Sequence, residues 1–191
     1  MEEPPDRVQQ PPADALPVGS RRPSAGLLIR VSTGSGIGPT RLAAFDSALF
    51  AAGVAGYNLI RLSSVVPPHA VVLEVPGSEQ VQGAVGDVAY CVYAAAYASN
   101  PGDQAWAGLA WAVDPERFGA GLFVEHSACS ESVVRRDLTM TIEAMSQTRG
   151  HRYQTAGQTV SSAVCIDHPV CAVVVATYGT AEWSDLLNSE G

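Results

Sequence analysis

The chain has 191 residues, of which 47% are apolar and 16% charged, with a formal net charge of −8 at pH 7. This composition suits one packed globular domain, and an acidic chain without basic clusters is a poor partner for nucleic acid or for an anionic membrane surface. The 11 basic residues counted in that charge are all arginine. Because lysine is absent, the chain cannot hold pyridoxal phosphate (PLP) through a lysine Schiff base, nor form a phosphate-binding loop of the GKS or GKT type.

Both ends of the chain are expected to be tails around a single domain. Residues 1–24 hold six of the 13 prolines and few large apolar groups, which predicts a disordered proline-rich tail. The domain is expected over residues 25–180, with a C-terminal tail over 181–191. The sequence lacks signal-peptide regions, a membrane-length apolar stretch and CxxC spacing, so we expect a cytoplasmic protein with buried free thiols and no membrane contact.

The first predicted strand covers residues 26–32 and leads into a glycine-rich segment over residues 34–39. We expect a turn there, in which the glycines adopt positive φ. The spacing does not match a dinucleotide-binding loop, because Gly34 and Gly36 would need a third glycine where Pro39 stands. Nucleotide binding is therefore disfavoured.

Thr40 is a typical N-cap, and the pattern behind it predicts a helix over residues 41–52. The predicted apolar stripe consists of Leu42, Phe45, Leu49 and Ala52. At about 100° per residue, Asp46 lies at the border of this stripe. A carboxylate there is expected to line a pocket while partly desolvated.

The rest of the domain is predicted to be rich in strands. A second helix is expected over residues 130–148, with a stop at Gly150 and a buried face of Val134, Leu138, Ile142 and Met145. Strands are expected over residues 57–62, 70–75, 85–98, 105–113, 120–125, 158–166 and 170–177. Many strands together with two helices of three or more turns predict an α+β layered domain.

The pair Ser63-Ser64 follows a predicted strand and precedes two valines and two prolines, whose fixed φ stiffens the segment. A serine peptide bond held in this way can cleave itself. The Ser64 hydroxyl attacks the Ser63 carbonyl to form an ester, and β-elimination followed by hydrolysis leaves a pyruvoyl group at the new N-terminus. This chemistry makes an electrophilic ketone without a lysine or an added cofactor.

Residues 40–68 closely resemble the pyruvoyl-dependent arginine decarboxylases. The order of the matching residues is as specific as their identity. The match is carried by Ala44-Phe45-Asp46, Ala52-Gly53, Asn58-Leu59-Ile60, Ser63-Ser64 and Pro67-Pro68. Further along, Gly121-Leu122-Phe123-Val124-Glu125 resembles the strand with the catalytic glutamate of that family, and the resemblance extends over about residues 28–178.

The resemblance implies a layered αββα sandwich that is self-cleaved between Ser63 and Ser64 into a β chain and an α chain. It implies that Ser64 becomes the covalent pyruvoyl cofactor, that Asn58 assists cleavage, that Asp46 binds the substrate guanidinium and that Glu125 donates a proton. It also implies a homotrimer, or a multiple of it, with active sites between neighbouring protomers. No metal is implied, and His69, His151 and His168 form no HxH or HExxH pattern.

Three functional interpretations follow. The first is decarboxylation of L-arginine to agmatine and carbon dioxide through a Schiff base to the pyruvoyl group. The second keeps this chemistry but acts on another amino acid, and the third is a relative that assembles without being cleaved and is not an enzyme. Without the resemblance, these residues would be read as ordinary surface residues. Asp46 would lie at a helix edge, Glu125 at a strand end, and Asn58 in a turn or at an edge.

Overall fold

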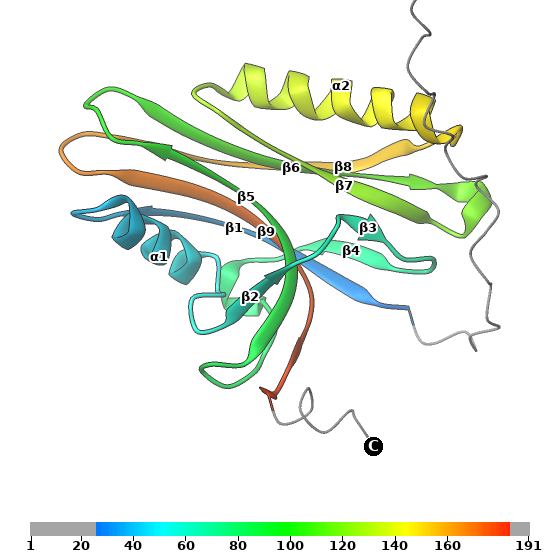
Figure 1. Cartoon of the computed structure of the whole chain (residues 1–191), viewed down its shortest axis with the longest axis horizontal. Coiled ribbons are helices and arrows are strands. Elements are labelled where there is room, and N and C mark those ends of the chain that lie inside the picture. The colour runs from blue at the N-terminus through cyan, green and yellow to red at the C-terminus, as the bar shows by residue number, and fades with distance from the viewer. Residues whose placement is uncertain (1–25, 184–191) are drawn as a thin grey trace, which may run out of the picture.

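The computed structural model describes residues 26–183, in which two β-sheets lie face to face and each carries one helix on its outer side (Figure 1). The predicted αββα sandwich is therefore confirmed. The predicted tail over residues 1–24 and residues 184–191 lie outside the described part. In chain order the elements are β1 (Leu28–Ile37), α1 (Arg41–Ala51), β2 (Asn58–Arg61), β3 (Val65–Val66), β4 (Val71–Glu74), a 3₁₀ turn (Gly77–Glu79), β5 (Val88–Ala98), β6 (Gln104–Asp114), a 3₁₀ turn (Pro115–Arg117), β7 (Ala120–Ala128), α2 (Glu131–Arg149), β8 (Gln154–Val164) and β9 (Val170–Ala181).

The two sheets differ in how their strands pair. Sheet A has the order β2-β5-β9-β1-β4, in which β9 is antiparallel to both neighbours while the outer pairs β1–β4 and β2–β5 are parallel. Sheet B has the order β3-β7-β6-β8 and is antiparallel throughout. The two-residue strand β3 thus forms an edge of sheet B, directly after the Ser63-Ser64 pair.

Three apolar layers hold the sandwich together. One lies between the sheets, one between α1 and sheet A, and one between α2 and sheet B. Neighbouring residues on a strand point to opposite faces, so on β7 Phe123 enters the layer between the sheets while Val124 packs under α2. The same alternation directs Glu125 toward sheet A.

The glycine-rich segment is not the predicted turn. Strand β1 continues through it, and Gly34 and Gly36 pair with Val173 and Cys171 of β9 without positive φ. Their role is close packing, because a Cβ added to Gly34 would lie 2.1 Å from the backbone oxygen of Ala48 in α1. The helix therefore rests directly on the backbone of β1.

The predicted stripe of α1 is confirmed at three of its four residues, since Leu49 and Ala52 are buried and Phe45 packs against them. The buried residues of the helix are Ala44, Ala48 and Leu49, whereas Leu42 is 76% exposed. Small side chains occupy the contact because the helix and β1 leave no room for large ones. Asp46 is exposed rather than partly desolvated at the border of a buried stripe.

The second helix agrees better with its prediction. Val134, Leu138 and Ile142 form the buried face of α2, and Gly150 caps the helix with a φ of 64°. Met145 is only partly buried. Among the predicted buried thiols, Cys129 is exposed, while Cys91, Cys165 and Cys171 are buried and all four are free.

The described structure continues past the predicted domain end at residue 180. Strand β9 reaches Ala181, and the indole of Trp183 donates a hydrogen bond to the carbonyl of Gly86 at 2.9 Å. Across residues 26–183, no helix is long and apolar enough to cross a membrane.

Replacing Gly34 by alanine is expected to lower the free energy of unfolding by about 1–3 kcal/mol, because the new methyl group meets the α1 backbone. Urea denaturation measures the change. Gly56→Ala is the matched control, since its Cβ would meet only Val85, at an ordinary 3.7 Å. Equal stability of the two variants would contradict the proposed role of Gly34.

Candidate active site

Two of the predicted site residues, 61 positions apart in the sequence, meet in the structure. The Ser64 hydroxyl donates a hydrogen bond to Oε1 of Glu125 at 2.5 Å, and the contact is partly buried. This length lies at the short end of the usual range for a hydroxyl donor. The pair joins a candidate nucleophile to a group that can accept its proton.

The pairing of β3 with β7 produces this contact. Val65 lies opposite Leu122, and the backbone N–H of Phe123 donates to the Ser64 carbonyl at 2.8 Å. Glu125 stands two residues beyond Phe123, on the same face of β7. Residue 64 is thereby held against the Glu125 side chain by backbone hydrogen bonds.

Ser64 has a strained backbone. Its φ is 63°, in the left-handed region that a residue with a Cβ seldom adopts. Such a conformation costs about 1–3 kcal/mol and persists only where the surroundings enforce it. Here the strain falls on the residue whose hydroxyl contacts Glu125, while Ser63 on the other side of the peptide bond is exposed.

Tyr178 adds a second restraint after Ser64. Its hydroxyl donates to the carbonyl of Val65 at 2.9 Å, and its ring packs edge-on against Phe123. Burial raises the pKa of Tyr178 well above its usual value, and the nearby charge of Glu125 raises it further. The phenol therefore stays protonated and remains a donor at neutral pH.

A cavity of about 190 Å³ opens beside Glu125, between β5 of sheet A and β7 of sheet B. Arg61 supplies its positive charge. The guanidinium donates to the carbonyl of Tyr93 at 3.0 Å and lies 4.9 Å from the centre of the Tyr93 ring. The lining residues are Arg61, Tyr93, Ala94, Ala95, Glu125, His126 and Ser127.

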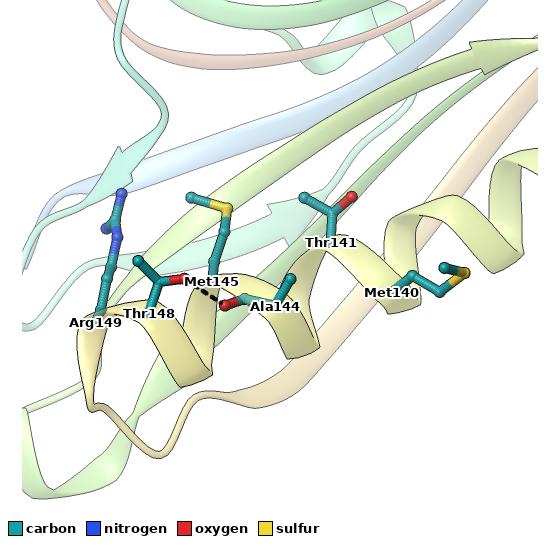
Figure 2. A pocket seen from close by; sticks show the side chains of 6 residues that line it. All are labelled: Met140, Thr141, Ala144, Met145, Thr148 and Arg149. Carbon is teal, nitrogen blue, oxygen red and sulfur yellow. Dashed lines mark hydrogen bonds between the residues drawn. The ribbon is translucent and has the colours of Figure 1, made fainter. Parts of the chain in front are cut away.

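His126 follows Glu125 in sequence, but its ring turns to the opposite face of β7. Its Nε2 lies 2.8 Å from Oγ1 of Thr141 on α2. Thr141 also lines a wider surface cavity of about 550 Å³ that runs along α2 (Figure 2). Arg149 is the charged residue among the six that line it, and the lining offers no nucleophile paired with an acid, so we place the active site at Glu125.

The other two predicted site residues do not join Ser64 within this chain. Asn58 begins β2 and its side-chain amide donates to the carbonyl of Gly86 at 2.6 Å. Because β2 is extended, at about 3.3 Å per residue, it separates Asn58 from Ser63 along the chain. Asp46 is exposed on α1, which covers the outer face of sheet A, whereas Glu125 faces the inner side of that sheet.

Two contributors to the site were not anticipated from the sequence. These are the Phe123 backbone N–H and the Tyr178 hydroxyl, and both act on backbone carbonyls. Phe123 lies in the motif that ends at Glu125, but nothing in that motif shows the role of its backbone N–H, and Tyr178 lies at the edge of the resemblance without a motif of its own. Among residues 26–183, no group of three His, Cys, Asp or Glu side chains is arranged to hold a metal ion.

The chain is similar to known proteins over most of its length. The family model described as "Pyruvoyl-dependent arginine decarboxylase (PvlArgDC)" matches residues 28–182. A pyruvoyl-dependent arginine decarboxylase of Halobacterium salinarum is 36% identical over 156 residues, which cover 81% of this chain and 95% of the relative. One from Methanothermobacter thermautotrophicus is 29% identical and covers 73% of this chain and 96% of the relative.

Among solved structures, a pyruvoyl-dependent histidine decarboxylase matches 50% of this chain and 52% of its own, with a TM-score of 0.40 and 17% identity. That likeness is distant and partial. The family model and the relatives each cover most of the chain and include the Ser64 and Glu125 positions. The chain belongs to the pyruvoyl-dependent arginine decarboxylase family.

Proposed function

We propose that the chain cleaves itself between Ser63 and Ser64, and that the mature protein decarboxylates L-arginine to agmatine and carbon dioxide in the cytoplasm. The observation that carries the proposal is the 2.5 Å hydrogen bond from the strained Ser64 to Glu125. The names of the relatives support arginine as the substrate.

The cleavage step uses groups that are already in contact. The Ser64 hydroxyl oxygen bonds to the Ser63 carbonyl carbon while Glu125 takes the hydroxyl proton. The C–N bond between residues 63 and 64 then breaks, and the proton passes from Glu125 to the released amine nitrogen. Removal of the Ser64 Cα proton then expels the Ser63 carboxylate. Water hydrolyses the remaining dehydroalanine to a ketone and ammonia, which balances the reaction without any external oxidant.

A pyruvoyl group fits at position 64. It keeps the carbonyl that Phe123 N–H binds, and its methyl group is smaller than the serine side chain it replaces. When present, the group supplies a ketone that takes the substrate amine and draws off the electrons released as carbon dioxide leaves. In the proposed reaction the Phe123 N–H polarises the adjacent carbonyl, and Glu125 delivers a proton to the substrate carbon.

Substrate orientation follows from the charges at the cavity. Arg61 lines the cavity beside Glu125 and would repel a second guanidinium. The substrate side chain must therefore extend away from Arg61. A carboxylate that accepts two hydrogen bonds in a plane is the group that suits a guanidinium, and we assign this role to Asp46.

We infer that Asp46 acts on the site of a neighbouring copy. One helical turn to either side of it, Leu42 is 76% and Phe50 79% exposed, so the outer face of α1 presents apolar groups around a carboxylate. A second copy of the chain is the occupant that would bury these groups and bring Asp46 to a Ser64–Glu125 pair. This supports an assembly with sites between protomers, and we propose a homotrimer, or a multiple of it, as the family resemblance implies.

For Asn58 we propose an indirect part in cleavage. Its amide ties the start of β2 to Gly86, and the backbone N–H of the same residue donates to Asp87. These bonds fix the strand that leads to Ser63. Asn58 thereby limits the movement of the carbonyl that Ser64 attacks.

Mass spectrometry of the purified protein is expected to find a 64–191 fragment with a blocked N-terminus that reacts with carbonyl reagents. Ser64→Ala should remain one uncut chain without activity, because it lacks the attacking oxygen. Ser127→Ala, which alters a cavity residue that takes no part in cleavage, is the control and should be cut. An active enzyme made only of uncut chains would exclude this proposal.

Glu125→Gln is expected to reduce decarboxylation about 10²–10⁴-fold, since the amide cannot donate the required proton. Its oxygen can still accept the Ser64 hydroxyl, so cleavage should continue, although more slowly. Steady-state turnover, divided by the carbonyl content per chain, separates the two effects. Glu143→Gln on the exposed surface of α2 is the control, and normal turnover of cut Glu125→Gln would remove Glu125 from the mechanism.

Asp46→Asn is expected to lower kcat/KM for arginine about ten- to a hundredfold, because a charged hydrogen-bond acceptor is lost, while cleavage stays intact. Wild-type kcat/KM should fall from arginine to lysine and ornithine, and further to neutral citrulline. Asp167→Asn in an exposed turn is the control. Preference of the wild type for a neutral or acidic amino acid would exclude arginine and leave the pyruvoyl chemistry standing.

A further inference from the structure

Tyr178 connects the two sheets at the cleavage site. It belongs to β9 of sheet A, but its hydroxyl binds the carbonyl of Val65 in β3, at the edge of sheet B. On the way its ring meets Phe123 of β7 edge-on, with ring centres 6.0 Å apart. The side chain thus reaches the residue that directly follows Ser64.

An irregularity in sheet A coincides with this side chain. Between β5 and β9 the register passes from Tyr90 opposite Gly179 to Cys91 opposite Thr177, which leaves Tyr178 without a counterpart on β5. Bulges of this kind bend a strand and redirect side chains, often beside active sites. The adjoining Thr177 has a buried hydroxyl that, within the described residues, makes no hydrogen bond. The strand bulge and the unpaired Thr177 hydroxyl are both unfavourable, and both lie where Tyr178 reaches β3.

The chain is restrained on both sides of the scissile bond, but Ser63 is held less directly than Ser64, through the Leu62 N–H that donates to the carbonyl of Cys91 at 2.8 Å. After the bond, the Ser64 carbonyl accepts from Phe123 and the Val65 carbonyl accepts from Tyr178. Before it, Ser63 is exposed. Once the bond is cut, residue 64 becomes a chain end that precedes a strand of only two residues, and such ends fray unless they are tied down.

We propose that Tyr178 is a positioning residue that holds residue 64 in register against Glu125 after the chain has been cut. This inference rests on the proposed function, because it assumes that the reactive group forms at position 64. The Tyr178 hydroxyl donates a hydrogen bond to the backbone carbonyl of Val65, so it acts on the chain next to residue 64 and not on the reacting atoms. Its effect should fall on the rate of proton delivery, which depends strongly on the distance between Glu125 and residue 64.

Tyr178→Phe tests the proposal, because it keeps the ring that packs on Phe123 and removes only the hydroxyl. We expect complete cleavage, one reactive carbonyl per cut chain, and a kcat for arginine about tenfold lower with KM within about twofold of the wild type. A second measurement needs no substrate. Hydrogen exchange of the Phe123 amide, whose partner is the Ser64 carbonyl, should be about tenfold faster in the cut variant.

Tyr57→Phe is the matched control, since Tyr57 also donates its hydroxyl to a backbone carbonyl, that of Val81, at 3.1 Å. It should retain wild-type kcat and wild-type exchange at Phe123. Wild-type kcat and exchange in Tyr178→Phe, equal losses in both variants, or failure of Tyr178→Phe to be cut would each overturn the inference. An active wild-type enzyme that is not cut at Ser63–Ser64 would instead overturn the proposed function, so the two failures are distinguishable.

Discussion

The pairing of two residues of β3 with β7 is the contact on which the site depends. It fixes Val65 and Val66 at the edge of sheet B, and through the Phe123 N–H it also fixes the Ser64 carbonyl. The strand period of two then places Glu125 on the same face as Phe123, beside the Ser64 hydroxyl. The left-handed backbone at Ser64 is sustained by these bonds, which explains how a serine retains a conformation that normally favours glycine.

The contact between Ser64 and Glu125 has apolar packing on one side and a charged cavity on the other. Between the sheets, apolar packing and the protonated Tyr178 hold the backbone, while the cavity on the other side of Glu125 carries the charge of Arg61. A cationic substrate therefore meets a cation within the chain and needs its matching carboxylate from elsewhere. We propose that the exposed Asp46, set between Leu42 and Phe50 on α1, supplies this carboxylate from a neighbouring copy of the chain.

Much of this could be predicted from the sequence. The absence of lysine, the Ser63-Ser64 pair and the order of the motifs around it indicated a self-made ketone, and the apolar pattern of α2 indicated its buried face. The glycines of β1 were misinterpreted because the sequence does not distinguish a glycine needed for close packing from one needed for positive φ. The predicted stripe of α1 was wrong at Leu42, which is exposed, and it left out Ala44 and Ala48, which form the contact with β1. Tyr178 could not be found because its role arises from a bulge and a bond to a backbone carbonyl, and neither leaves a sequence pattern.

The proposed function requires that position 64 carries the reactive carbonyl beside Glu125. The most direct test is to incubate the enzyme with isotopically labelled L-arginine and cyanoborohydride, then digest it and locate the label by mass spectrometry. We expect one label per cut chain, attached at residue 64 through the substrate amine, with loss of activity in proportion to labelling. A label at any other residue, or full inactivation without a label at residue 64, would contradict the proposed function.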